Sequence, residues 1–105
     1  MKFGQEIAAA RKKAGLSQKD LAAELQKEDG GTISPQYLND IERDRRNPPN
    51  GFILKQLASV LDLPYDFLLF KAGQWPEEMR EQEIKPEKFQ KVFQAFRKNL
   101  EKGGR

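Results

Sequence analysis

The chain has 105 residues, of which 37% are hydrophobic, and this length and composition suit one small domain with a short appended element. It contains no histidine and no cysteine, so the commonest general base and metal ligand are missing, and no catalytic motif is recognisable. We therefore expect no enzyme activity, no cofactor and no metal, whereas the net charge of +3 suits a polyanionic partner.

The first two predicted helices lie close together at the start of the chain. A helix is expected over residues 2–14, because apolar side chains recur there at helical spacing and Gly15 follows as a stop. Its apolar positions are Phe3, Ile7, Ala10 and Ala14. Ser17 is suited to cap a second helix, with Asp20 as its capping-box partner. The buried positions expected on the second helix are Leu21, Ala22 and Leu25, and residues 29–31, Asp-Gly-Gly, form a break after it.

Three further helices are predicted up to residue 73. Ser34 caps the third, with Pro35 at the first helical position, where its missing N–H costs nothing. Residues 46–49, Arg-Asn-Pro-Pro, form a loop, since two prolines cannot continue a helix. Asn50 can cap the fourth helix and Pro64 opens the fifth. Their expected core residues are Ile53, Leu54, Leu57, Ala58, Leu61, Phe67 and Leu68.

The third helix has two chemically different faces. Rotation at ~100° per residue places Leu38 and Ile41 together toward the core. The opposite face carries Gln36, Asn39, Asp40 and Arg43. Glutamine and asparagine can bond adenine, arginine can bond guanine, and aspartate can accept from the cytosine amino group. Tyr37 lies at the margin, where it could contact a thymine methyl or a phosphate.

A polar helix face is by itself ordinary, but its neighbours favour a DNA-reading function. The basic loop directly after the helix contains Arg45, Arg46 and Asn47, which could bind phosphates. Gln18, at the start of the second helix, is a further hydrogen-bond donor, at a helix N-terminus that could meet a phosphate. A capped short helix, a turn, a reading helix and a basic loop together have the layout of a helix-turn-helix, whose second helix enters the DNA major groove.

These segments resemble the lambda-repressor-like (Cro-type, XRE-family) helix-turn-helix family over about residues 3–73. The resemblance is carried by residues 7–18 (IAAARKKAGLSQ), 21–22, 33–34, 37–38, 41–43, 47–48, 57–63 and 67–69. It implies an all-α, five-helix DNA-binding domain over residues 1–73 that commonly acts as a dimer. It also implies that Gln18 contacts phosphate, that Gln36, Asn39 and Asp40 read bases, and that Arg11 and Glu42 form a structural ion pair.

The chain departs from the family pattern in two places. The turn from Gln26 to Thr32 is about six residues longer than usual, a length that costs little chain entropy. Because phosphate would repel Glu28 and Asp29, we expect this loop to point away from DNA or to contact something else. Asp44 stands where the family often has glycine.

Residues 74–105 form a C-terminal helical extension with a different pattern. An acidic helical turn is expected from Trp75-Pro76 to about residue 82, and an amphipathic helix over residues 86–101. The apolar stripe of this last helix consists of Phe89, Val92, Phe93, Phe96 and Leu100. The stripe could pair with its copy in a dimer, pack back on its own domain near Trp75 and Phe70, or capture a protein partner such as a toxin.

The sequence therefore predicts a sequence-specific transcriptional regulator that binds double-stranded DNA. We expect a repressor that binds a near-palindromic operator as a homodimer; the alternative is the antitoxin of a toxin–antitoxin pair. No apolar run is long enough to span a membrane, and the polar start of the chain is unlike a signal peptide. We accordingly expect a cytoplasmic protein of bacterial or phage type, associated with the nucleoid when bound.

Overall fold

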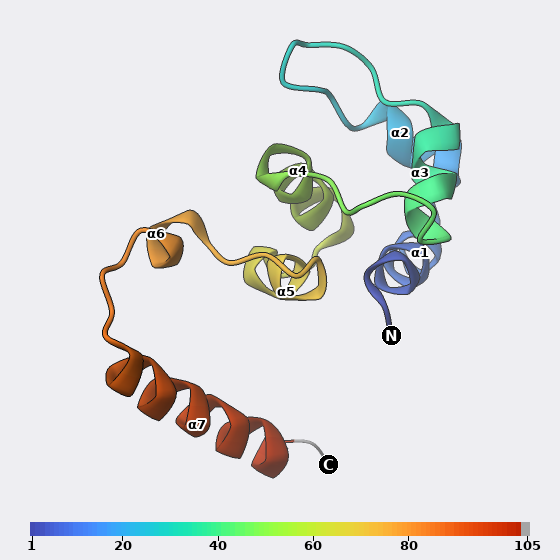
Figure 1. Ribbon diagram of the computed structural model, residues 1–105. Coiled ribbons are helices and arrows are strands. Elements are labelled where there is room, and N and C mark those ends of the chain that lie inside the picture. The colour runs from blue at the N-terminus through green and yellow to red at the C-terminus, as the bar shows by residue number, and fades with distance from the viewer. Residues whose placement is uncertain (104–105) are drawn as a thin grey trace.

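The computed structural model describes residues 1–103, and its helices are joined by loops, of which the one between α2 and α3 extends far from the helices (Figure 1). In chain order they are α1 (Phe3–Lys13), α2 (Gln18–Ala23), α3 (Pro35–Glu42), α4 (Gly51–Leu61), α5 (Tyr65–Lys71), α6 (Glu77–Arg80) and α7 (Pro86–Gly103). Within these described residues the only extended pairing is an isolated antiparallel bridge between Gln26 and Thr32. The predicted all-α class is confirmed.

The core lies between the first five helices. Helix α3 packs against both α1 and α2, and α4 packs against α5 and α1. The buried hydrophobic residues are Phe3, Ile7, Leu21, Ala22, Leu25, Ile33, Leu38, Ile41, Leu54, Leu57, Ala58, Leu61, Leu68 and Leu69. Leu38 and Ile41 are fully covered, as the rotation of the third predicted helix requires, and this leaves the opposite face of α3 turned outward.

Short-range capping sets where α2, α3 and α4 begin. Ser17 Oγ accepts from the Asp20 N–H at 3.0 Å, while Asp20 Oδ2 accepts from the Ser17 N–H at 3.1 Å, completing the predicted capping box. Ser34 Oγ and Asn50 Oδ1 accept from backbone N–H groups three residues later. The predicted helix starts are confirmed because each depends on residues that are neighbours in the chain.

Some helix boundaries and burial assignments differ from the sequence prediction. Ala14, expected on the apolar stripe of the first helix, is exposed, because α1 ends at Lys13 and Ala14 is only its C-cap. Gly15 then takes a left-handed conformation with φ of +74° and turns the chain away. The acidic turn is shorter than predicted, since α6 ends at Arg80, and α7 continues past residue 101 to Gly103.

The start of α1 lies directly against the end of α3. A Cβ atom on Gly4 would lie 2.4 Å from the Ile41 carbonyl oxygen and 2.6 Å from that of Glu42, so only glycine allows this approach. Asp44, which lies two residues beyond the end of α3 and has φ of 56°, accepts a hydrogen bond from the Gly4 N–H at 3.3 Å. Aspartate tolerates the left-handed region better than most residues, and its carboxylate also satisfies a free donor at the α1 start. This contact explains how aspartate serves where glycine is usual.

Replacement of Gly4 tests this close approach. Gly4→Ala is expected to lower the free energy of unfolding by about 1–3 kcal/mol, because the added methyl group must push α1 off the backbone of α3. Helix propensity alone predicts the opposite change, an increase of about 1 kcal/mol in the free energy of unfolding. Urea unfolding followed by circular dichroism measures the change, with Ala9→Gly on the exposed side of α1 as the propensity control. A stabilised Gly4→Ala variant would contradict the tight α1–α3 contact.

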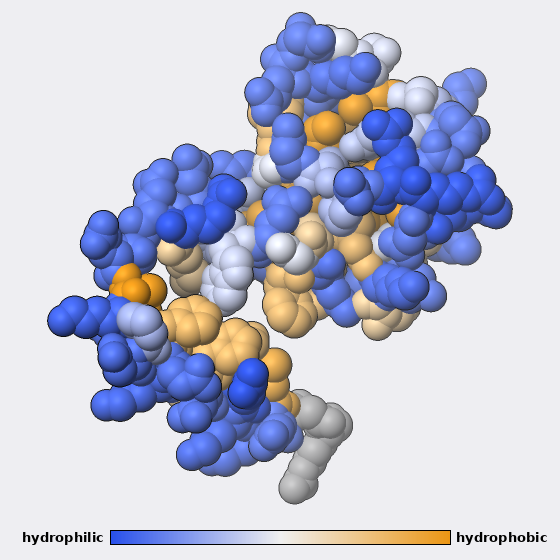
Figure 2. All heavy atoms as spheres, in the orientation of Figure 1, coloured by the Kyte–Doolittle hydropathy of each residue, from blue (hydrophilic) through white to orange (hydrophobic). Residues whose placement is uncertain are grey.

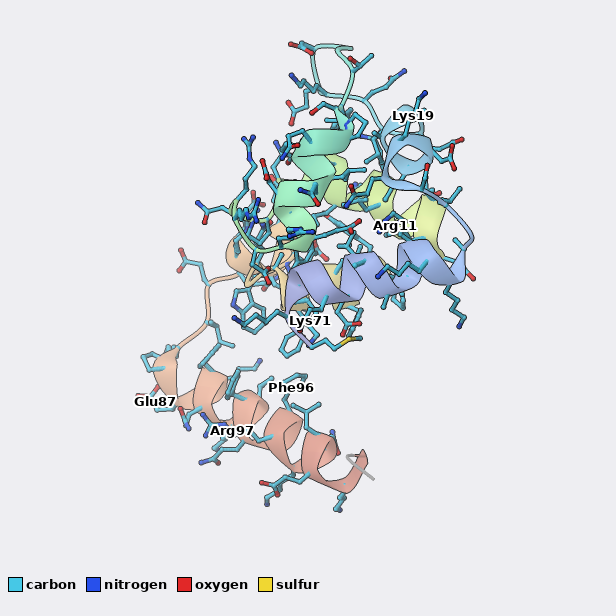
Figure 3. All side chains as sticks on the ribbon, turned by 90° about the vertical axis from the view of Figure 1, so that its right-hand side faces the viewer. Arg11, Lys19, Lys71, Glu87, Phe96 and Arg97 are labelled. Atoms are coloured by element: carbon cyan, nitrogen blue, oxygen red, sulfur yellow. The ribbon has the colours of Figure 1, made fainter. Side chains whose placement is uncertain are left out.

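Helices α6 and α7 lie outside the core (Figure 1). The aromatic contact between α7 and the first five helices joins Phe96 to Phe70, with ring centroids 6.5 Å apart. Figure 3 shows Phe96 extending from α7 toward the helices that form the core. Each helix in residues 1–103 is too short or too polar to span a membrane.

Candidate nucleic-acid interface

The outward face of α3 presents the polar side chains that the sequence predicted for base reading. Gln36 and Arg43 are exposed, whereas Asn39 and Asp40 are half-buried at their sides. Arg43 is the C-cap of α3, so it extends from the very end of the helix. Glutamine, asparagine, aspartate and arginine on one face supply both donors and acceptors for base edges. The structure thus brings these four predicted residues together on one surface.

Hydrogen bonds hold this face in a defined arrangement. Gln36 Nε2 donates to Asp40 Oδ1 at 3.1 Å, one helical turn away. Asn39 Oδ1 accepts from Arg43 Nε at 3.2 Å and from Gln18 Nε2 at 3.3 Å. The four side chains are therefore held in two hydrogen-bonded pairs, Gln36 with Asp40 and Asn39 with Arg43. Side chains that are already oriented lose less conformational entropy when they bind.

Gln18 connects α2 to α3. Its amide nitrogen donates to Asn39 and also to Glu42 Oε1, at 3.1 Å. The sequence assigned Gln18 to a phosphate contact, and in the structure a phosphate oxygen would have to replace one of these two acceptors. The observed bonds make Gln18 a link between Asn39 on the outward face of α3 and the nearly buried Glu42.

Glu42 forms a nearly buried ion pair with Arg11. Arg11 Nε and Nη2 donate to the two carboxylate oxygens at 2.6 and 3.0 Å, and Arg11 Nη1 donates to the Leu16 carbonyl at 2.8 Å. The side chains are 11% and 6% exposed. The hydrogen bond that Arg11 donates to Glu42 raises the pKa of Arg11 above its ordinary value, and burial has the opposite, smaller effect. Figure 3 shows Arg11 on α1. The pair joins α1, α3 and the turn before α2.

The loop after α3 brings its basic residues beside Tyr37. Arg45, Arg46 and Asn47 are exposed, and the Arg46 guanidinium lies 4.7 Å from the centre of the Tyr37 ring. These residues line a surface depression of about 520 Å³ together with Asp44, Pro48 and Pro49. Burial raises the pKa of the Tyr37 phenol above its ordinary value. The positive charge of Arg46 acts in the opposite direction, but its effect is smaller than that of burial. The hydroxyl therefore stays protonated at neutral pH and can donate to a phosphate.

The long turn between α2 and α3 is an ordered hairpin, which the sequence reasoning missed. Gln26 and Thr32 form the antiparallel bridge, the Lys27 N–H donates to the Gly31 carbonyl at 2.8 Å, and the Gly30 N–H donates back to Lys27 at 2.9 Å. Gly30 has φ of +87°. The Asp-Gly pair was the available signal, since this dipeptide favours tight hairpin turns. We call residues 26–32 the hairpin.

The hairpin is attached to α4 by side-chain hydrogen bonds. Gln56 Oε1 accepts from the Gln26 N–H at 2.9 Å, and Gln56 Nε2 donates to the Gln26 carbonyl at 2.8 Å. Asn50 Nδ2 donates to Glu28 Oε1 at 3.3 Å. The base of the hairpin is thus held by two bonds to one side chain, and its acidic Glu28 lies toward the start of α4.

Comparison with known proteins identifies the class that this fold and surface define. Residues 7–68 match the helix-turn-helix family, and the chain belongs to its XRE-type members, which are DNA-binding regulators of transcription. The chain is 31% identical to the transcriptional regulator RghRB of Bacillus subtilis strain 168 over 104 residues, 96% of this chain and 68% of that protein. It is 36% identical to the immunity repressor of Bacillus phage phi105 over 103 residues, 97% of this chain and 67% of that protein. ImmR of Bacillus subtilis strain 168 is 35% identical over 71 residues, 68% of this chain and 50% of its own length.

Proposed function

We propose that this regulator is a repressor that binds a near-palindromic operator as a homodimer, with α3 in the major groove. The observation that carries the proposal is the outward face of α3, where oriented donors and acceptors lie beside a basic loop. The similarity to a phage immunity repressor supports repression as the outcome of binding. The protein then acts in the cytoplasm, where its operator lies.

The residues divide into base-reading and phosphate-binding groups. Base reading falls to Gln36, Asn39, Asp40 and Arg43, which share the outward face of α3. Phosphate binding falls to Tyr37, Arg45, Arg46 and Asn47, which flank that face. Gln18 positions Asn39 and can exchange one acceptor for a phosphate. Phosphate contacts supply affinity and register, and base contacts supply sequence preference.

The apolar stripe of α7 supports dimerisation. Phe89, Val92, Phe96 and Leu100 are 41%, 56%, 44% and 53% exposed in the single chain. Figure 2 shows hydrophobic side chains gathered along α7 on the side turned toward the other helices. The Phe96–Phe70 contact leaves most of this stripe exposed to water. Packing of α7 on the first five helices therefore does not by itself bury the stripe.

A second copy of α7 is the occupant that we propose for this stripe. An isologous contact places the same apolar face on both sides, and the polar face of α7 then remains in solvent. Dimerisation through α7 would set the two reading helices at half-sites about one helical turn, roughly 10 bp, apart. Capture of a different protein, as an antitoxin would require, is the competing outcome.

Base reading by α3 is tested at Gln36. Gln36→Ala is expected to lose about 1–3 kcal/mol of discrimination at one base position, because a bidentate amide–base contact disappears. Selection of bound duplexes from a random library, followed by binding to single-base variants of the selected site, measures this loss. Gln82→Ala, an exposed amide outside the first five helices, is the matched control. Equal loss of affinity for selected and random DNA would contradict the base-reading role.

A further inference from the structure

The hairpin turns two neighbouring charges to different sides. Glu28 bonds Asn50 at the start of α4, whereas Lys27 lines a depression of about 230 Å³ beside α3. The other residues around the depression are Thr32, Ile33, Ser34, Tyr37 and Arg46. Lys27 is therefore the charged side chain of the hairpin that lines this depression beside α3.

The position of Lys27 is set by the rest of the fold. Its own N–H bonds the Gly31 carbonyl within the hairpin, and the preceding residue is held on both backbone groups by Gln56 of α4. The chain enters and leaves the hairpin at Leu25 and Ile33, which are 2% and 5% exposed. A basic side chain on a hairpin anchored in this way can hold a reproducible place relative to α3.

The chemistry around the depression suits a phosphate group. Lys27 and Arg46 supply two cations, and Thr32, Ser34 and Tyr37 carry hydroxyl groups. No carboxylate is among the residues that line it in the described part of the chain. Two of the lining residues, Tyr37 and Arg46, also line the larger depression of the basic loop, so the two surfaces are continuous.

We propose that Lys27 binds a DNA phosphate beside the groove entered by α3, so that the hairpin extends the DNA footprint by one backbone contact. This inference rests on the proposed function of α3 as the reading helix. The two acidic hairpin residues keep their charges, but neither of them lines the depression around Lys27. Glu28 is occupied by Asn50, and Asp29 Oδ1 accepts from the Gly31 N–H at 2.8 Å, within the hairpin itself.

The salt dependence of DNA binding by the full chain tests the proposal. Lys27→Ala is expected to weaken binding to selected and random duplexes alike, and to reduce the slope of log affinity against log salt by about 0.9. Lys27→Arg should restore most of the slope, since a cation of similar reach returns. Arg46→Ala, at the same depression, sets the scale for losing one phosphate contact, and Arg80→Ala on α6 controls for net charge. Thermal unfolding checks that each variant is folded.

The outcomes separate the inference from the function on which it rests. A slope change for Lys27→Ala like that of Arg46→Ala, together with loss of one phosphate in ethylation interference, supports the contact. If the wild-type chain binds DNA and Lys27→Ala behaves as Arg80→Ala, the hairpin contact is overturned while the proposed function stands. If the wild-type chain selects no duplex at all, the proposed function itself fails, and the contact with it.

Discussion

Glu42→Ala is expected to lower the free energy of unfolding by about 3–5 kcal/mol, because it leaves the Arg11 charge buried without its partner. The Arg11 side chain is 11% exposed, so water cannot replace the two hydrogen bonds that the carboxylate accepts. The same substitution removes an acceptor from Gln18, which holds Asn39 on the reading face. Stability and DNA recognition should therefore decline together.

Urea unfolding of matched variants measures this effect. The double variant Arg11→Met with Glu42→Leu removes both charges and should recover most of the loss, since apolar replacements of a buried pair are often neutral. Glu77→Ala, which removes an exposed carboxylate on α6, should change the free energy by less than about 0.5 kcal/mol. A Glu42→Ala variant as stable as Glu77→Ala would show that the ion pair does not hold the helices together.

Phe96→Glu is expected to convert the proposed dimer to a monomer and to weaken operator binding by about 100-fold or more. The added carboxylates would face each other across an apolar contact, where each would lose its water without gaining a partner. A monomer also loses the avidity of two linked reading helices, a factor of about 10² to 10⁴. Affinity for an isolated half-site should stay unchanged, because Phe96 contacts Phe70 on α5 and is not among the residues proposed to contact DNA.

Gln94→Glu is the matched control for this prediction. It adds the same charge to α7 on the exposed side away from the stripe, so it should leave the dimer intact. Light scattering gives the mass of each variant, and binding to duplexes with one and two half-sites gives the avidity. A wild-type chain that stays monomeric with and without DNA would overturn the homodimer. If the wild-type chain is instead recovered in a complex with a second protein bound to α7, and Phe96→Glu does not form that complex, the antitoxin alternative is favoured.

Sequence alone was sufficient where structure depends on near neighbours. Ser17, Ser34 and Asn50 each bond a backbone N–H three residues away, so the helix starts could be read directly from the chain. The direction of Leu38 and Ile41 follows from helical rotation, and the outward face of α3 follows from the same geometry. The amphipathic character of α7 could likewise be predicted from its spacing.

Contacts between distant segments required the folded chain. The hairpin is placed by Gln56, which lies thirty residues after the backbone groups that it bonds. The sequence predicts a phosphate contact for Gln18, and the structure adds that both of its observed acceptors, Asn39 and Glu42, lie on α3. The hydrogen bond that Asp44 accepts from the Gly4 N–H could not be predicted from neighbouring residues, because it forms only when the start of α1 packs beside Asp44.

The sequence by itself determined the helices, their caps, the family and the chemistry of the reading face. The helices, their caps and the side chains on the outward face of α3 follow from periodicity or from residues within one helical turn. The family follows from the resemblance of several separate segments to its pattern. The tertiary structure decided which side of the hairpin faces α3 and how Gln18 connects the reading face to the Arg11–Glu42 pair. These features depend on how separate helices pack, because a hydrogen bond between distant residues forms only when packing has already brought them together.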